Sequence, residues 1–270
     1  MRYHGAKWKM APRIISHFPA HGTYVEPFGG SGAVLLRKPR SVSEVYNDVF
    51  EDVVNVFRVL RDPVLADLLR DACHLTPYAR SEFESPIDRS DPVEWARGVV
   101  FRSFSGYGSG AAVESHNTGF RSRRSDHSPN PASDWSNWPQ HVAALTERLR
   151  GVVIECRDAL AVMALHDGLN TLHYLDPPYV HSTRYSSKTR VYAEEMGDSD
   201  HAGLIAHAKA MKGMVAISGY RCALYDDLLS SWRRVDFEVL ADGAKPRTES
   251  LWMNYPESKV SSPVQGNLFG

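Results

Sequence analysis

The stretch "TYVEPFGGSGAVLL", residues 23–36, constrains the fold more than any other part of the chain. A short strand-like run leads into closely spaced glycines, and an apolar helix-forming run follows them. A second unit, "SVSEVYNDVFEDVVNVFRVLRD", predicts a strand ending near Tyr46 and then an amphipathic helix. The apolar face of that helix should comprise Val53, Val54, Phe57 and Leu60. Successive strand–helix units favour an α/β fold.

The second half of the chain repeats this alternation. We expect strands in "VVIECRDAL", "TLHYLD" and "MVAISGY", with a helix over Asp200 to Met211 before the last of them. The segment "VDFEVLADGAKPRTESLWMNY" predicts a β-hairpin that turns at Asp242-Gly243. Because strands alternate with helices at both ends of the chain, the sequence predicts a doubly wound, Rossmann-like sheet.

The composition and the predicted elements change in the middle of the chain, from about Pro63 to Arg150. Helix-like pieces, Val64 to Cys73 and Pro92 to Ser103, frame a long polar stretch rich in Gly, Ser, Asn and Pro. A loop of that length is usually functional or partly mobile. We therefore expect an inserted, mostly helical domain between the two α/β parts.

Composition limits the location and the metal chemistry. The chain has 270 residues and a formal net charge of −1, so any basic surface must be local. Its apolar runs are too short to span a membrane, and "MRYHGAKWKM" has no apolar signal region. The cysteines form no CxxC pair, which is typical of a reduced, cytoplasmic protein. The histidines have no metal-like spacing, so we predict no metal site and expect His166, His173 and His207 at the core edge or surface.

The glycine loop has the features of a ligand-binding turn. Gly29, Gly30 and Gly32 would let a ligand lie against the backbone, with the helix N-terminus pointing at it. Asp48 follows the next strand, where an acid can bind the two hydroxyls of an adenosine ribose. Leu35 stands where a nicotinamide fingerprint wants a third glycine, which weakens that interpretation. An ordinary tight turn beside a solvated Asp48 remains the alternative.

The stretch "HYLDPPYVH" ends another predicted strand in an unusual way. Pro177 and Pro178 cannot donate backbone hydrogen bonds, so the strand must stop there. The result is a stiff turn that presents Asp176 and Tyr179 side by side. Such a turn cannot extend a sheet, but it can form a catalytic or binding site. A plain loop after a strand is the simpler alternative.

Taken together, these motifs resemble the Dam-like family of S-adenosylmethionine-dependent DNA adenine-N6 methyltransferases. In "YHGAKWKM", Tyr3, Gly5 and Lys7 match the family's N-terminal cofactor motif, and Ala6 departs from its second glycine. The segment "YVEPFGGSGAVLL" is similar to the methionine-binding loop, "YNDVFEDVVNVF" to the ribose-binding acid and helix, "CRDAL" to the adenine-holding step, and "LDPPY" to the catalytic tetrapeptide. The resemblance covers nearly all of Met1 to Pro256 except the middle insert.

The resemblance implies a cofactor and a set of residues that bind it. The cofactor is S-adenosylmethionine, held between the glycine loop and the acids that follow neighbouring strands. The residues implied are Tyr3, Lys7, Glu26, Pro27, Phe28, Gly29, Gly30, Ser31, Gly32, Asp48, Asp158, Ala159 and Asp176.

The resemblance also implies how Asp176, Pro177, Pro178 and Tyr179 take part in catalysis. The exocyclic nitrogen of adenine is a poor nucleophile because its lone pair is delocalised into the ring. Asp176 accepts one amino hydrogen and the carbonyl of Pro177 accepts the other, which stabilises the charge that develops on the nitrogen. The ring of Tyr179 stacks on the adenine. A base inside a duplex cannot reach this turn, so it must be flipped out.

Two basic segments are candidates for contact with double-stranded DNA. The segment "GFRSRR" is loosely similar to the basic hairpin that family members use on DNA, and it carries Arg121, Arg123 and Arg124. A solvated loop tip is the alternative. After the catalytic turn, "HSTRYSSKTRVY" could close over a flipped base. Its basic residues are Arg184, Lys188 and Arg190.

We therefore interpret residues 1–62 and 151–256 as the catalytic methyltransferase domain, 63–150 as an inserted target-recognition domain and 257–270 as a flexible tail. The alternatives are the same transfer to RNA adenine, cytosine N4 or a protein glutamine, and a non-catalytic DNA-binding protein that kept the fold. The aspartate at 176 favours DNA adenine, because the family's glutamine and RNA enzymes more often have asparagine there.

The tail "ESKVSSPVQGNLFG" carries one further pattern. Gln265, Leu268 and Phe269 stand in the order Gln-x-x-Leu-Phe, which resembles the peptide by which bacterial replication proteins dock on the sliding clamp. A flexible tail can offer two apolar anchors to a pocket. The alternative is a frayed end whose Leu268 and Phe269 pack back on the enzyme.

Overall fold

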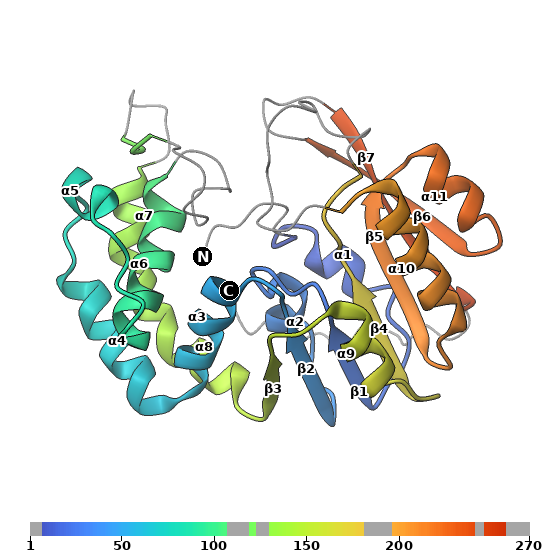
Figure 1. The fold of residues 1–270 in the computed structure, drawn as a ribbon, viewed down its shortest axis with the longest axis horizontal. Helices are drawn as coiled ribbons and strands as arrows, with labels where there is room; N and C mark the ends of the chain where they lie inside the picture. The colour runs from blue at the N-terminus through green and yellow to red at the C-terminus, as the bar shows by residue number, and fades with distance from the viewer. Residues whose placement is uncertain (1–6, 107–118, 123–129, 181–195, 241–245, 258–270) are drawn as a thin grey trace. The chain divides into compact units, whose positions relative to one another are not determined.

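The computed structural model describes residues 7–106, 119–122, 130–180, 196–240 and 246–257 (Figure 1). The chain divides into two compact units. The first, called the helical unit below, comprises the described residues within Phe50–Cys156. The second, called the sheet unit, comprises the other described residues, within 7–49, 157–180, 196–240 and 246–257. The functional division into a catalytic domain, a recognition domain and a tail stays a prediction.

The strands form one seven-stranded sheet in the order β3-β2-β1-β4-β5-β7-β6. Strand β1 pairs in parallel with β2 and β4, β4 pairs in parallel with β5, and β7 pairs antiparallel with both β5 and β6. The predicted mixed α/β, Rossmann-like sheet is therefore confirmed, and the turn at Asp242-Gly243 lies outside the described residues. The strands are β1 (Thr23–Glu26), β2 (Ser43–Asn47), β3 (Val152–Glu155), β4 (Thr171–Leu175), β5 (Met214–Tyr220), β6 (Arg233–Leu240) and β7 (Pro246–Met253).

Helices cover both faces of the strands in the sheet unit. Its helices are α1 (Ala11–Ile15), α2 (Ala33–Arg37), α9 (Ala159–Leu165), α10 (Asp198–Ala210) and α11 (Ala223–Leu228). On one face, Leu175 and Ile217 pack with buried side chains of α9, α10 and α11. On the other, Phe18, just after α1, packs against the rings of Tyr24 and Tyr174. Strand side chains alternate between these two faces, so the central strands are apolar on both.

The centre of β4 corrects one expectation. All five residues of this strand are buried, and His173 is 0% exposed rather than at the core edge or surface. Its Nε2 lies 3.6 Å from a carboxylate oxygen of Asp167. Burial lowers the pKa of His173 to about 4, although Asp167 opposes the shift, so the ring is neutral at neutral pH.

In the helical unit, three helices begin with a proline that follows an N-cap side chain. Its helices are α3 (Glu51–Arg61), α4 (Pro63–Leu75), α5 (Arg80–Glu84), α6 (Pro92–Ser105), α7 (Pro131–Asn137) and α8 (Val142–Leu149), with a 3₁₀ turn, η2 (Trp138–His141). Asp62, Asp91 and Asn130 each precede a proline and accept two backbone N–H groups of the first turn. The predicted helices near 64–73 and 92–103 are confirmed, and Val53, Val54, Phe57 and Leu60 of α3 are all buried.

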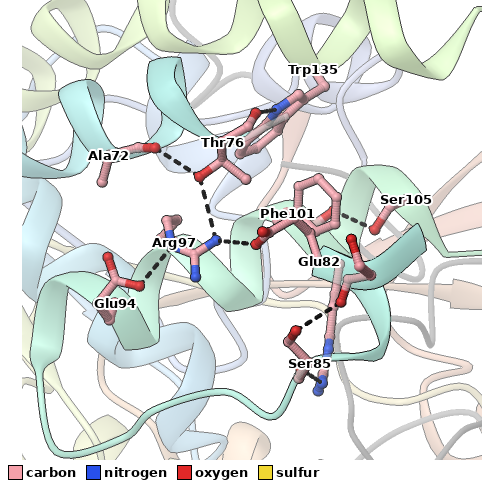
Figure 2. Close-up of polar contacts among 11 residues, drawn as sticks. Ala72, Thr76, Glu82, Ser85, Glu94, Arg97, Phe101, Ser105 and Trp135 are labelled. Atoms are coloured by element: carbon pink, nitrogen blue, oxygen red, sulfur yellow. Dashed lines mark hydrogen bonds and ion pairs between the residues drawn. The ribbon is translucent and has the colours of Figure 1, made fainter. Parts of the chain in front are cut away.

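A polar junction around Thr76 joins α4, α5, α6 and α7 (Figure 2). Arg97 of α6 lies 3.2 Å from Glu82 of α5 and 3.4 Å from the hydroxyl of Thr76, which follows α4. The indole N–H of Trp135, on α7, donates to the Thr76 carbonyl at 2.9 Å. These side chains therefore cross-link the helices through hydrogen bonds and an ion pair. Among the helices that the structure describes, none is long and apolar enough to cross a membrane.

Candidate active site

The carboxyl ends of three parallel strands bring most of the predicted site residues to one edge of the sheet unit. The glycine loop follows β1, Asp48 follows β2 and Asp176 follows β4. Because β1 lies between β2 and β4, these three segments are neighbours. Ligands of open α/β sheets bind outside the carboxyl ends of the strands. The position of these residues is therefore that of a ligand site.

The glycine loop has a backbone that other residues would not adopt easily. Gly30 and Gly32 have φ angles of 48° and 62°, in the left-handed region, and Gly32 caps α2. A Cβ at Gly29 would clash with the ring of Tyr46. The Tyr46 hydroxyl donates to the Gly30 carbonyl at 2.7 Å, and the Gly30 N–H donates to a carboxylate oxygen of Asp48, also at 2.7 Å. The loop is thus fastened to the end of β2, with Asp48 directly beside it.

Glu26, at the end of β1, faces inward. It is 2% exposed, and one of its oxygens accepts the Tyr24 hydroxyl at 2.7 Å and the Leu35 N–H of α2 at 2.9 Å. Burial raises the pKa of Glu26 to about 8, against the effect of these two hydrogen bonds, so its carboxyl carries a proton at neutral pH. Its side chain therefore anchors α2 to β1.

Asn47 is a site residue that the sequence interpretation missed. It is 0% exposed, and its amide nitrogen donates to the carbonyls of Pro27 and Arg157 at 2.9 and 3.0 Å. Its amide oxygen accepts the Arg157 N–H at 2.9 Å. One side chain thus ties the start of the glycine loop to the residue before Asp158. Its position directly before Asp48 was the sequence signal that could have identified Asn47 as a site residue.

The catalytic turn has a dense set of polar contacts. The Asp176 oxygen Oδ1 accepts two hydrogen bonds, from the Lys7 ammonium and from the Ser218 hydroxyl of β5, both at 2.8 Å. The Ser218 hydroxyl in turn lies 2.9 Å from that of Tyr174. Among the residues that the structure describes, none donates to the second oxygen, Oδ2. One oxygen of Asp176 is therefore saturated and the other is open.

Tyr179 shares the Lys7 ammonium with Asp176. Lys7 donates to the Tyr179 hydroxyl at 2.6 Å, and the Tyr179 ring packs against the ring of Tyr220, with centroids 4.4 Å apart. The Tyr179 hydroxyl also lies 3.2 Å from Glu249 of β7. Burial by itself lowers the pKa of Lys7, but Asp176 and Glu249 outweigh it and raise that pKa well above the usual range. Lys7 is therefore a permanent cation at the turn.

Other predicted cofactor residues lie near these segments with different exposure. Pro27 is buried and Phe28 half-buried against the core, and Ser31 is half-buried. Asp158 is exposed and caps α9 by accepting the Ala161 N–H at 2.9 Å, with Ala159 half-buried beside it. In the catalytic turn itself, Pro177 is buried and Pro178 is half-buried. Tyr3 lies outside the described residues.

Arg121 is the one predicted DNA-binding residue within the described part of the chain, and it belongs to the helical unit. Its N–H donates to the Ser105 carbonyl at 2.6 Å, and its carbonyl accepts the Tyr78 hydroxyl at 2.7 Å. Phe120 beside it packs on Tyr78 and forms a single bridge with Gly106. The backbone at Arg121 is thus pinned to the end of α6. The other predicted basic residues, Arg123, Arg124, Arg184, Lys188 and Arg190, and the tail residues Gln265, Leu268 and Phe269 lie outside the described residues.

The sequence interpretation also gave no role to two residues that contact the catalytic turn, Ser218 on β5 and Glu249 on β7. Both meet the catalytic turn only through the pairing of β5 with β4 and β7. In the described ranges, no group of His, Cys, Asp and Glu has the geometry to hold a metal ion.

Comparison with known proteins identifies the family. The model of the D12 class N6 adenine-specific DNA methyltransferases matches residues 3–85 and 114–242, which include the glycine loop, Asp48, Asp158 and the catalytic turn. A comparison with curated proteins finds no match. The family match covers more than half of the chain, so the chain belongs to the D12 class N6 adenine-specific DNA methyltransferase family and is a DNA adenine-N6 methyltransferase.

Proposed function

We propose that this enzyme transfers a methyl group from S-adenosylmethionine to the N6 amine of an adenine that is flipped out of double-stranded DNA at a specific site. One observation carries the proposal. The rigid turn with Asp176 and Tyr179 lies at the same sheet edge as the glycine loop and Asp48, within a chain of the adenine-N6 family.

The residues at this edge fit the proposed cofactor. Left-handed glycines leave the loop backbone open to a ligand, and Asp48 lies beside them as an acceptor for ribose hydroxyls. When bound, S-adenosylmethionine supplies an electrophilic methyl group. We propose that the chain holds it with Tyr3, Lys7, Glu26, Pro27, Phe28, Gly29, Gly30, Ser31, Gly32, Asp48, Asp158, Ala159 and Asp176.

Asp176 is proposed to accept a hydrogen of the adenine amine through Oδ2. Oδ1 is already occupied by Lys7 and Ser218, which also fix the plane of the carboxylate. The carbonyl of Pro177 accepts the second amine hydrogen. Together the two acceptors stabilise the positive charge that develops on the nitrogen, so they act mainly in the transition state.

Tyr179 is proposed to stack on the adenine. Its hydroxyl is held by Lys7 and Glu249 and its ring by Tyr220, so the ring is presented in one orientation. Pro177 and Pro178 stiffen the turn that carries it. Because a paired base cannot enter a cradle of this kind, the target adenine must leave the stack.

Target recognition is proposed for residues 63–150, with Arg121, Arg123 and Arg124 on the DNA. Arg184, Lys188 and Arg190, which follow the catalytic turn in sequence, are proposed to contact the DNA as well. The pinned backbone at Arg121 supports this assignment, since a fixed backbone limits the positions its guanidinium can reach. A sliding-clamp contact through Gln265, Leu268 and Phe269 has no support in the described residues or in the family match, which ends at residue 242.

The test is tritiated methyl transfer from S-adenosylmethionine to duplex DNA, RNA and protein in parallel, with the labelled product identified by digestion. We expect label in N6-methyladenine of duplex DNA. Label in cytosine, RNA or protein would replace this function by one of its alternatives. DNA binding without transfer to any substrate would mean a non-catalytic protein.

Asp48→Ala should weaken S-adenosylmethionine binding by roughly 1–3 kcal/mol, because it removes a charged hydrogen-bond acceptor for the ribose. Titration calorimetry measures the effect. Asp227→Ala, an exposed acid on α11, is the control and should leave the affinity unchanged. Equal affinities of the Asp48 variant and the wild type would mean that the ribose is held elsewhere.

Asn47→Asp should also weaken cofactor binding, by roughly 1–3 kcal/mol, because a carboxylate cannot donate to the carbonyls of Pro27 and Arg157. The two loops then lose their common support. Asn254→Asp is a matched control, since Asn254 also bridges backbone groups, at Gly213 and Val215. The control should lower the melting temperature without a comparable loss of affinity; similar affinity losses in both variants would indicate a general effect on folding.

A further inference from the structure

Glu249 is a buried acid beside the catalytic turn, and the sequence interpretation gave it no role. It lies on β7, paired with Tyr220 of β5 and Phe237 of β6, and it is 2% exposed. It lies beyond residue 242, where the family match ends. Burial of a carboxylate costs free energy unless partners compensate, so its contacts should explain why it is there.

The partners of Glu249 are two groups of the catalytic turn. Its oxygen Oε1 lies 3.3 Å from the Lys7 ammonium, and its two oxygens lie 3.3 and 3.2 Å from the Tyr179 hydroxyl. Burial raises the pKa of Glu249, and Lys7 opposes that shift. The Lys7 ammonium therefore lies between two carboxylates, Asp176 at 2.8 Å and Glu249 at 3.3 Å.

This arrangement gives both reactive side chains of the turn one common support. Lys7 binds Asp176 and Tyr179 directly, and Glu249 binds Lys7 and Tyr179. The Tyr220 ring, which packs on the Tyr179 ring, belongs to the residue paired with Glu249 across the sheet. The pairing of β5 with β7 therefore fixes the acid and the stacking partner together.

We propose that Glu249 is a positioning residue for methyl transfer, which holds Lys7 and Tyr179 so that Asp176 keeps Oδ2 directed at the amine and Tyr179 keeps its stacking orientation. The inference rests on the proposed function. Glu249 acts through Lys7 and Tyr179, and it touches neither the adenine nor the methyl group.

Glu249→Gln tests the role because it keeps the shape and removes the charge. We expect kcat to fall by on the order of 10²-fold, the cost of a small misplacement of reacting groups, while the S-adenosylmethionine Kd and the melting temperature stay near wild type. Glu238→Gln, an exposed neutralisation on the adjacent strand β6, should leave kcat unchanged. A kcat of Glu249→Gln equal to that of the control would overturn the proposal.

A double-mutant cycle separates positioning from a general structural role. If Glu249 acts through the Tyr179 hydroxyl, Glu249→Gln and Tyr179→Phe combined should reduce kcat by much less than the product of the two single effects. Multiplicative losses would contradict the proposal.

If Glu249→Gln does not fold, Glu249→Asp takes its place. It keeps the charge but withdraws it from Tyr179, and wild-type turnover of that variant would equally overturn the inference.

The two proposals fail in different ways. Wild-type enzyme that binds S-adenosylmethionine but leaves duplex adenine unmethylated would overturn the proposed function and this inference with it. Active wild-type enzyme together with a fully active Glu249→Gln variant would overturn the inference alone.

Discussion

Asp176→Ala should lower the rate of methyl transfer by roughly 10³-fold or more, because it removes an acceptor whose contact with the amine matters mainly in the transition state. The substitution should not unfold the turn. Lys7 keeps Glu249 and the Tyr179 hydroxyl as partners, so its charge is not left alone in the interior. The open oxygen Oδ2 makes no contact within the described residues that the variant would break.

The measurement is single-turnover transfer to a duplex oligonucleotide, with S-adenosylmethionine affinity determined separately by calorimetry. We expect a large loss of rate beside a nearly normal cofactor affinity. Asp227→Ala is again the control for removing an acid from the sheet unit. Near-normal turnover of Asp176→Ala would exclude the proposed role of the carboxylate, whereas a large loss of cofactor affinity would make Asp176 chiefly a cofactor ligand.

The strand ends of the site could be predicted because their signals are local. The glycines at 29, 30 and 32, the acid at 48 and the prolines at 177 and 178 each interrupt a strand-like run, and strand ends in parallel sheets meet at one edge. The helices near 64–73 and 92–103 were also predicted, and the structure shows that each begins at an Asp-Pro pair. Asn47, directly before Asp48, was within reach of this reasoning, but the interpretation gave it no role.

Ser218 and Glu249 could not be predicted, because their roles depend on strand order. Glu249 meets the turn only because β7 enters the sheet between β5 and β6, antiparallel to both. The residues of "RTESLWMNY" do not indicate whether this strand lies inside the sheet or at its edge. His173 was misjudged for a related reason, since a histidine in a strand looks polar until both faces of that strand are covered. Long-range pairing carries this information, and local patterns do not.

The second large effect concerns stability, at an ion pair between the end of α2 and the start of β2. Lys38 and Glu44 are 2% and 3% exposed, with the ammonium 2.6 Å from the carboxylate. The same ammonium donates to the Pro39 carbonyl and the Ser41 hydroxyl at 2.7 and 2.8 Å, and lies 4.5 Å from the centre of the Tyr24 ring. The Ser41 N–H also donates to the Glu44 carboxylate, at 3.1 Å, but a neutral donor does not balance its charge as the ammonium does.

Lys38→Met should therefore lower the free energy of unfolding by about 3–5 kcal/mol, because it removes the ammonium 2.6 Å from the buried Glu44 carboxylate. Urea unfolding followed by circular dichroism measures the change. Lys38→Met combined with Glu44→Gln should recover much of the loss, since the second substitution removes the negative charge that Lys38 balances. Arg70→Met is the contrasting control: Arg70 also pairs with two acids, Asp67 and Asp71, but all three are exposed, so unfolding should hardly change. Equal stability of Lys38→Met and wild type would mean that the ion pair does not hold β2 against the segment that follows α2.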